Sequence, residues 1–195
     1  IINDGQHRRA AIELAMREKP ELADESIAVV FFVDRGLERC QQMFADLNRY
    51  AIRPSKSIGV LYDHRDQMAK LAKLIVLRIP LFRDLVDMEK STLALRSRKL
   101  FTLSAIYTAT NALFSSFKED TITERARIGE SYWNEVSKQF PDWQLVRDGR
   151  IPASQIRSNY IHSHGITLQA IGKLGADLYA SIPDEISSRL GLLKE

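Results

Sequence analysis

A run of seven consecutive apolar residues, Ile27–Val33, constrains the fold of this chain more than any other stretch. Isoleucine, valine and phenylalanine dominate the run, and no polar residue interrupts it. Such a pattern predicts a strand that is buried on both faces, as in a sheet covered by helices.

Helical periodicity lies on both sides of this predicted strand. The first helix is expected from Gln6 to about Lys19, where Pro20 ends it. The second is indicated by apolar residues at three- and four-residue spacing, namely Leu37, Cys40, Phe44, Leu47 and Ala51. Since Ile1-Ile2 resembles the end of another strand, the order of elements is typical of an α/β unit. We therefore predict a small α/β domain over residues 1–57, in a fragment whose N-terminal strands are missing.

Beyond Pro54 the pattern changes to helices. Helical stretches are expected at Gln67–Ile79, Phe101–Phe117, Thr121 to about Phe140, Ser154–Ala180 and in a short segment from Pro183. Residues 58–195 are thus predicted to form a mostly helical region, and the fold class is α+β or α/β.

Composition excludes several classes of protein. Cys40 is the only cysteine, which rules out a disulfide framework and a cysteine-based zinc site within one chain. No apolar run approaches the roughly 18 residues of a membrane span, and no signal peptide precedes the first motif, so we expect a cytoplasmic protein.

Basic residues are concentrated in the middle of the chain. Residues 49–99 carry 12 basic and 5 acidic side chains, whereas the whole chain has a net charge of only +3. This segment is either a contact surface for phosphates or a solvated helix face. Its densest cluster contains Arg96, Arg98 and Lys99, which we predict as DNA-binding residues.

The segment Asp4-Gly5-Gln6-His7-Arg8-Arg9 carries the most chemical information. Gly5 permits a tight turn, and the helix that follows presents free N–H groups to an anion. Arg8 and Arg9 add donors that suit phosphate. We therefore predict a phosphate or nucleotide site here; the alternative is a turn with surface charges.

Further residues are candidates for the same site. Asn48, Arg49 and Lys56 follow the second predicted helix and would complete a phosphate cradle if the fold brings them beside Asp4–Arg9. A metal site is not expected at Asp63, His64 and Asp66, because neighbouring residues of a helix point in different directions. Helix capping by Asp63 is favoured there instead. His162 and His164 lack a nearby carboxylate and a third histidine, so no metal is expected there either.

Four blocks of the chain, in this order, resemble the DndB family: Asp4–Arg8 (the sequence DGQHR), Gln41–Arg49, Ser57–Asp66 and Glu89–Leu93. The resemblance continues through Phe101–Ala105 and weakens after about residue 120. The DGQHR sequence is also similar to the phosphate-binding turn of the ParB/sulfiredoxin superfamily. Gln6 stands where sulfiredoxin has its cysteine, so sulfiredoxin's thiol chemistry is excluded.

The resemblance implies a role in DNA phosphorothioation, in which sulfur replaces a non-bridging phosphate oxygen. It implies a regulator that binds promoter DNA of the modification genes, with other sulfur-modification proteins as further partners. Whether the chain forms a homo-oligomer is left open. The cofactor is unknown, with a nucleoside triphosphate such as ATP as the candidate. One alternative is a nucleotide hydrolase or DNA-nicking enzyme in which Asp4 and His7 are catalytic; another is a non-catalytic assembly partner of the modification enzymes.

Overall fold

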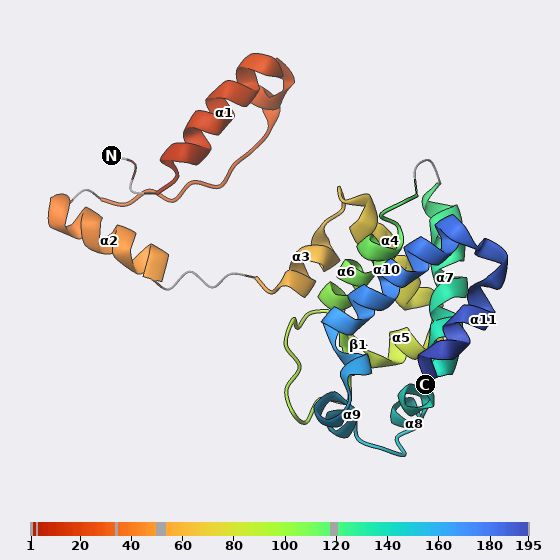
Figure 1. Cartoon of the computed structure of the whole chain (residues 1–195). Coiled ribbons are helices and arrows are strands. Elements are labelled where there is room, and N and C mark those ends of the chain that lie inside the picture. Colours follow the sequence, from red (N-terminus) through yellow and green to blue (C-terminus); the bar gives the residue numbers. More distant parts are fainter. Residues whose placement is uncertain (1, 3, 34, 50–53, 118–120, 195) are drawn as a thin grey trace. The chain divides into compact units, whose positions relative to one another are not determined.

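The computed structural model describes residues 2, 4–33, 35–49, 54–117 and 121–194 (Figure 1). The chain divides into two units, residues 1–53 and residues 54–195. Within the described ranges, helices predominate and the only sheet is a pair of two-residue parallel strands, so the chain is an α+β protein. No helix in these ranges is long and apolar enough to cross a membrane.

The first unit contains both helices that the sequence predicts there. They are α1 (Gln6–Glu18) and α2 (Leu37–Arg49), with a short 3₁₀ helix, η1 (Pro20–Asp24), after α1. Pro20 lacks an N–H group and cannot continue α1, which explains the end of that helix. No described residue of this unit is buried.

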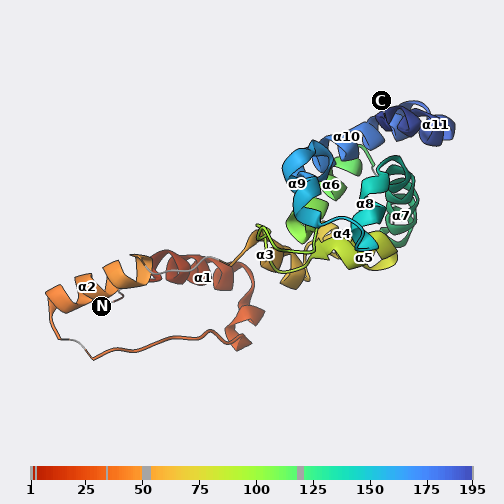
Figure 2. The ribbon, with the colours of Figure 1, turned by 90° about the horizontal axis from the view of Figure 1, so that it is seen from below.

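The predicted strand at Ile27–Val33 is not formed. Figure 2 shows this segment as irregular chain between η1 and α2, and its side chains are exposed, Phe31 by 90% and Val33 by 80%. A strand is stable only when its N–H and C=O groups pair with a neighbouring strand. The described residues of the first unit contain no strand with which this segment could pair, so the predicted α/β core is not seen there.

The second unit is helical apart from its two short strands. Its elements before residue 118 are α3 (Lys56–Tyr62), α4 (Gln67–Arg78), α5 (Pro80–Leu85), β1 (Val86–Asp87), β2 (Phe101–Thr102) and α6 (Leu103–Leu113). Those after residue 120 are α7 (Ile122–Gln139), α8 (Pro141–Arg147), α9 (Ala153–Asn159), η2 (Ile161–Ser163), α10 (Gly165–Ser181), η3 (Pro183–Glu185), α11 (Ile186–Leu190) and η4 (Gly191–Lys194).

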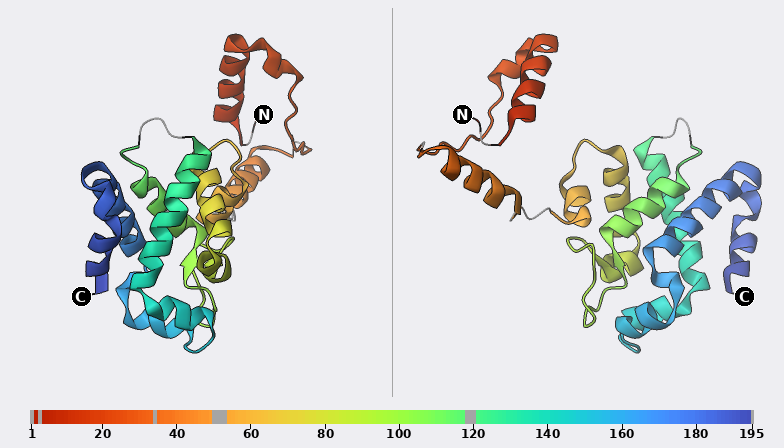
Figure 3. Two further views of the ribbon diagram at one scale, coloured as in Figure 1. Left: turned by 90° about the vertical axis from the view of Figure 1, so that its right-hand side faces the viewer. Right: turned by 60° about the vertical axis from the view of Figure 1, so that its left-hand side comes forward.

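The core of this unit forms where α10 lies along α6, with α4 and α7 packed nearby (Figures 1 and 3). Two glycines of α10 allow this close approach. A Cβ atom at Gly172 would lie 2.3 Å from the carbonyl oxygen of Ala109, and one at Gly175 would lie 2.5 Å from the Tyr132 ring. Trp133 and Trp143 are completely buried, as packing residues should be.

The strands β1 and β2 pair in parallel, with Val86 opposite Phe101 and Asp87 opposite Thr102. The helix predicted from Phe101 therefore begins at Leu103, and Thr102 caps it by accepting a hydrogen bond from the Ala105 amide. Because the two strands are parallel, residues 88–100 cross from the end of one strand to the start of the other.

The helix predicted over Ser154–Ala180 is interrupted at Tyr160–His164. There the side chain of His162 turns to Trp143, whose Nε1 donates to His162 Nδ1 at 2.9 Å, and the His162 ring stacks on Phe140 and Tyr160. This tertiary contact explains the break, because residues 159–164 contain no glycine or proline that would signal one.

Candidate nucleic-acid interface and anion sites

The DGQHR segment has the backbone geometry that the sequence predicts. Gly5 adopts a φ of 103°, in the left-handed region, and forms the N-cap of α1. No side chain caps this helix, so the first amide groups of α1 are left to solvent or to a ligand.

The charged side chains of the segment pair with neighbours on α1. Arg8 Nη2 lies 2.7 Å from Asp4 Oδ2, and Arg9 Nε lies 2.7 Å from Glu13 Oε1. All four side chains are at least half exposed. Gln6 donates to the Ile2 carbonyl at 2.9 Å, and His7 is exposed. Exposed ion pairs of this kind contribute about 0.2–1 kcal/mol, so a phosphate can compete for either arginine.

The other predicted members of this site are not brought to it by any described contact. Asn48 Nδ2 donates to the Phe44 carbonyl within α2, and Arg49 is exposed at the last turn of the same helix. Lys56 is exposed in the first turn of α3, in the second unit. That these three residues lie beside Asp4–Arg9 stays a prediction.

The predicted DNA-binding residues lie on the crossover between β1 and β2, in a segment that we call the basic loop (residues 94–99). Arg96 and Arg98 are exposed, and no ion pair occupies either of them in the part of the chain that the structure describes. Lys99 is half-buried. The basic loop therefore presents two free guanidinium groups.

Arg157, a residue that sequence reasoning missed, holds the basic loop from α9. Its Nη2 donates to the carbonyls of Ala94 and Leu95, both at 2.9 Å. Its Nη1 donates to the carbonyls of Ser97, at 3.1 Å, and of Lys99. Burial lowers the pKa of Arg157. One guanidinium group thus fixes the turn of backbone that carries the exposed Arg96 and Arg98.

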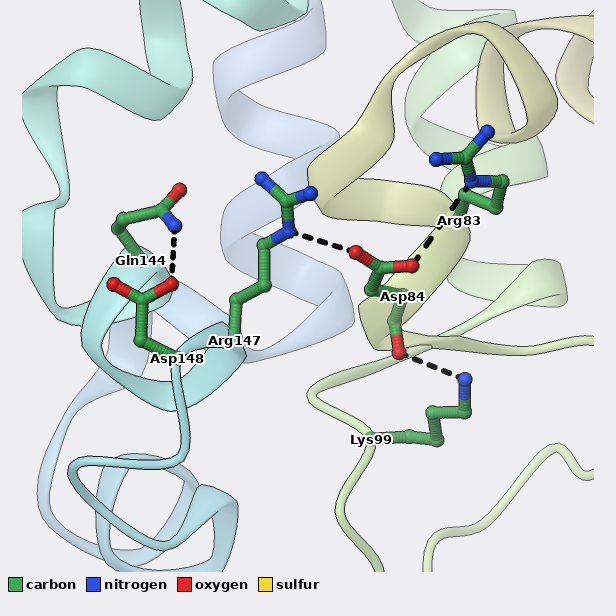
Figure 4. Close-up of polar contacts among 6 residues, drawn as sticks. All are labelled: Arg83, Asp84, Lys99, Gln144, Arg147 and Asp148. Atoms are coloured by element: carbon green, nitrogen blue, oxygen red, sulfur yellow. Dashed lines mark hydrogen bonds and ion pairs between the residues drawn. The ribbon is translucent and has the colours of Figure 1, made fainter.

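Lys99 is tied to a charged cluster at the other edge of the loop (Figure 4). Its Nζ donates to the Asp84 carbonyl at 2.8 Å, and the Asp84 carboxylate accepts from Arg147 Nε at 2.7 Å. Arg83 Nε lies 4.0 Å from the same carboxylate. Asp84 thus faces Arg83 and Arg147 through its carboxylate and Lys99 through its main-chain carbonyl.

A cleft of about 530 Å³ lies within the second unit. It is lined by Lys56, Ser91, Thr102, Ser104, Arg157, Ser163, His164 and Gln169, together with apolar residues and the start of α10. Ser57 organises one wall: its hydroxyl donates to the Lys90 carbonyl at 2.9 Å and accepts from the Ser104 amide at 3.2 Å. The hydroxyl of Ser57 thereby joins the backbone at Lys90 to the start of α6.

The residues weighed as metal ligands have other partners. Asp63 Oδ1 accepts from the amides of Arg65 and Asp66 and thus closes a turn, which lowers the pKa of Asp63. The helix cap of α4 is Asp66, three residues from the one predicted. His164 Nε2 lies 2.9 Å from the Arg157 carbonyl. Among the described residues, no three histidine, cysteine or acidic side chains are placed to share a metal ion.

Two of the site residues, Arg157 and Ser163, had no signal in the sequence. Arg157 stands alone in a polar helix, and its role depends on backbone carbonyls about sixty residues earlier in the chain. Ser163 is 5% exposed and its hydroxyl has no hydrogen-bond partner. Neither property can be seen in residue types or spacing.

Comparison with known proteins gives one match. The family model of DndB, described as DNA-sulfur modification-associated, matches residues 1–195. No curated protein and no solved structure gives a significant match. The family match covers the whole chain, including both the DGQHR segment and the basic loop, and this chain therefore belongs to the DndB family of DNA-sulfur modification-associated proteins.

Proposed function

We propose that this DndB-family protein binds duplex DNA through Arg96 and Arg98 of the basic loop. It thereby regulates transcription of the genes for DNA sulfur modification. The observation that carries the proposal is the pair of exposed guanidinium groups without ion-pair partners, on backbone that Arg157 holds in place. A loop that is ordered in advance loses little conformational entropy on binding, which favours contacts with phosphates.

Salt dependence tests this proposal directly. Each phosphate contact contributes about −0.9 to the slope of log affinity against log salt. The Arg96→Ala/Arg98→Ala variant should therefore bind a duplex more weakly and flatten the slope by about two units. Lys99 is left intact, since its ammonium group holds the Asp84 carbonyl and its removal would disturb the loop.

The matched control removes the same charge elsewhere. Arg127 and Arg189 are exposed and already paired with Glu124 and Glu185. Arg127→Ala/Arg189→Ala should keep the parent slope in fluorescence-anisotropy titrations. Equal slopes for both double variants would show that net charge, and not the basic loop, governs binding. Equal affinity for promoter and scrambled duplexes of one length would remove the regulatory part of the proposal.

The DGQHR segment is proposed as a separate nucleotide phosphate site. Arg8 would exchange Asp4 for the phosphate, and the uncapped first turn of α1 would donate to it. Arg8→Ala should abolish calorimetric binding of ATP, whereas Arg17→Ala, an exposed arginine at the other end of α1, should not. Equal affinity in both variants would contradict the site.

The same proteins separate the alternatives. ATP turnover that is lost in Asp4→Asn or His7→Ala would favour the hydrolase. A stable complex with the modification enzymes that survives the Arg8→Ala change, without any binding of nucleotide or DNA, would favour the assembly partner.

A further inference from the structure

We propose that the tip of the basic loop is a wedge that enters the minor groove of a DNA duplex. The Leu95 side chain separates one pair of stacked bases there and bends the duplex, while Arg96 lies beside it in the groove. This inference rests on the proposed binding of duplex DNA. It names what the loop recognises, namely a base step that unstacks easily.

Leu95 and Arg96 form the tip of the basic loop. They are the two central residues of a turn, which the Ser97 amide closes by donating to the Ala94 carbonyl at 2.9 Å. The crossover that carries this turn lies at the edge of the second unit, beside α9 (Figure 1). Both side chains of the tip are exposed, Leu95 by 73%. The tip therefore presents one apolar and one cationic side chain next to each other.

The other leucines of the crossover differ from Leu95 in their burial. Leu93 is half-buried and lines the cleft, and Leu100 is buried in the core. Both contribute burial free energy to the folded unit, whereas a leucine that stays in water contributes almost none. A turn that only closes the crossover would be served equally well by a polar residue. An apolar side chain at the tip, among cations, therefore indicates a surface that the loop contacts when it binds.

A wedge must keep its shape against stacked bases, and Arg157 supplies the rigidity. Its guanidinium group donates to the carbonyls of Ala94 and Leu95, both at 2.9 Å, and of Ser97 at 3.1 Å. The backbone is thus held on both sides of the tip. Because unstacking a base step is itself unfavourable, a wedge that is ordered in advance avoids the added loss of conformational entropy in the loop.

The residue types and the size of the tip favour the minor groove. Leucine is one of the side chains that proteins insert between base steps from this groove, and arginine is attracted by the negative potential there. The minor groove is only about 6 Å wide, whereas the major groove, at about 12 Å, admits a whole helix. A two-residue tip matches the narrower groove. Residues 94–99 contain no acidic side chain that the phosphates would repel.

The test compares two short duplexes that differ only in one central T·T mismatch, at which the bases are already weakly stacked. Affinity is measured by fluorescence anisotropy, and bending by energy transfer between dyes at the two ends of the duplex. The parent should bend the paired duplex and bind the mismatched one more tightly. Leu95→Ala should bind the paired duplex about tenfold more weakly, without bending it and without preferring the mismatch. Its salt slope should equal that of the parent, because no charge is removed.

Two control variants accompany this change. Leu95→Phe places another wedge residue at the tip and should retain the bend. Leu77→Ala removes a leucine of α4 that is 58% exposed, and it should leave affinity, bending and mismatch preference unchanged. The urea midpoint of both Leu95 variants should equal that of the parent, since the side chain is not part of the core.

Failure of the wedge can be distinguished from failure of the proposed function. Duplex binding whose salt slope depends on Arg96 and Arg98, but with no bend or with a bend that Leu95→Ala retains, would overturn the wedge alone. Duplex binding that does not depend on the two arginines would overturn the proposed function and the wedge with it. If Leu95→Ala left DNA binding intact but broke a complex with a modification enzyme, Leu95 would be a protein contact and the wedge would be wrong.

Discussion

Replacing Gly172 with alanine should destabilise the second unit, although alanine is the better helix former. An ideal Cβ at Gly172 would lie 2.3 Å from the Ala109 carbonyl oxygen and 3.2 Å from its carbonyl carbon. Close C···O contacts in proteins are roughly 3.3–3.6 Å, so α10 would have to move about 1 Å away from α6.

The magnitude follows from two opposing effects. Overpacking costs about 1–3 kcal/mol, and a rigid backbone oxygen places this site at the upper end. Removing glycine from a helix interior contributes about 1 kcal/mol in the opposite direction. We therefore expect the free energy of unfolding to fall by about 2 kcal/mol.

Gly59 provides the matched control, because it also lies within a helix but a Cβ there would meet nothing within 4 Å. Gly59→Ala should raise the free energy of unfolding by about 0.5–1 kcal/mol. Urea unfolding followed by tryptophan fluorescence measures both, since the only two tryptophans, Trp133 and Trp143, are buried in this unit. A Gly172→Ala protein as stable as Gly59→Ala would refute the packing argument.

Two further predictions concern polar groups of the same unit. Burial lowers the pKa of His162, which also accepts a hydrogen bond from Trp143. The stability of the unit should therefore be full above about pH 6.5 and should fall as the pH drops below that value. In His162→Gln, the urea midpoint should depend less on pH between about 7.5 and 5.5. Asp66 caps α4 and accepts a hydrogen bond from the Tyr107 hydroxyl at 2.7 Å. Asp66→Ala should therefore lower the free energy of unfolding by about 1–2 kcal/mol, and adding Tyr107→Phe should lower it little further. Additive losses of stability in the double variant would contradict this coupling.

The helices could be predicted well because their signals are local. Pro20 and Thr121 mark helix boundaries in the sequence, and the structure confirms both: α1 ends before Pro20, and Thr121 Oγ1 accepts from the Glu124 amide. The helix expected over Phe101–Phe117 is present over Leu103–Leu113.

Features that depend on distant partners could not be predicted. The apolar run Ile27–Val33 has strand composition, but a strand forms only with a paired neighbour. The break in the helix at Tyr160–His164 depends on Trp143. The sequence favoured Asp63 as a helix cap, whereas in the structure Asp66 accepts from the first amides of α4. For the candidate sites, residue type indicated the cations of the basic loop, whereas the backbone contacts of Arg157 and the buried hydroxyl of Ser163 depend on how distant parts of the chain pack.

The contacts of Arg157 also impose an order on folding. The four carbonyls that it holds belong to residues 94–99, which leave the ribosome well before residue 157 does. Until α9 has been synthesised and has packed against the unit, the backbone of these residues lacks the donors that fix it. We therefore expect the crossover between β1 and β2 to become protected from hydrogen exchange late in refolding, after α4 and α6, whose contacts with each other are closer in sequence. A nascent chain that ends before residue 157 would contain Arg96 and Arg98 but would lack the hydrogen bonds that fix the backbone of this loop.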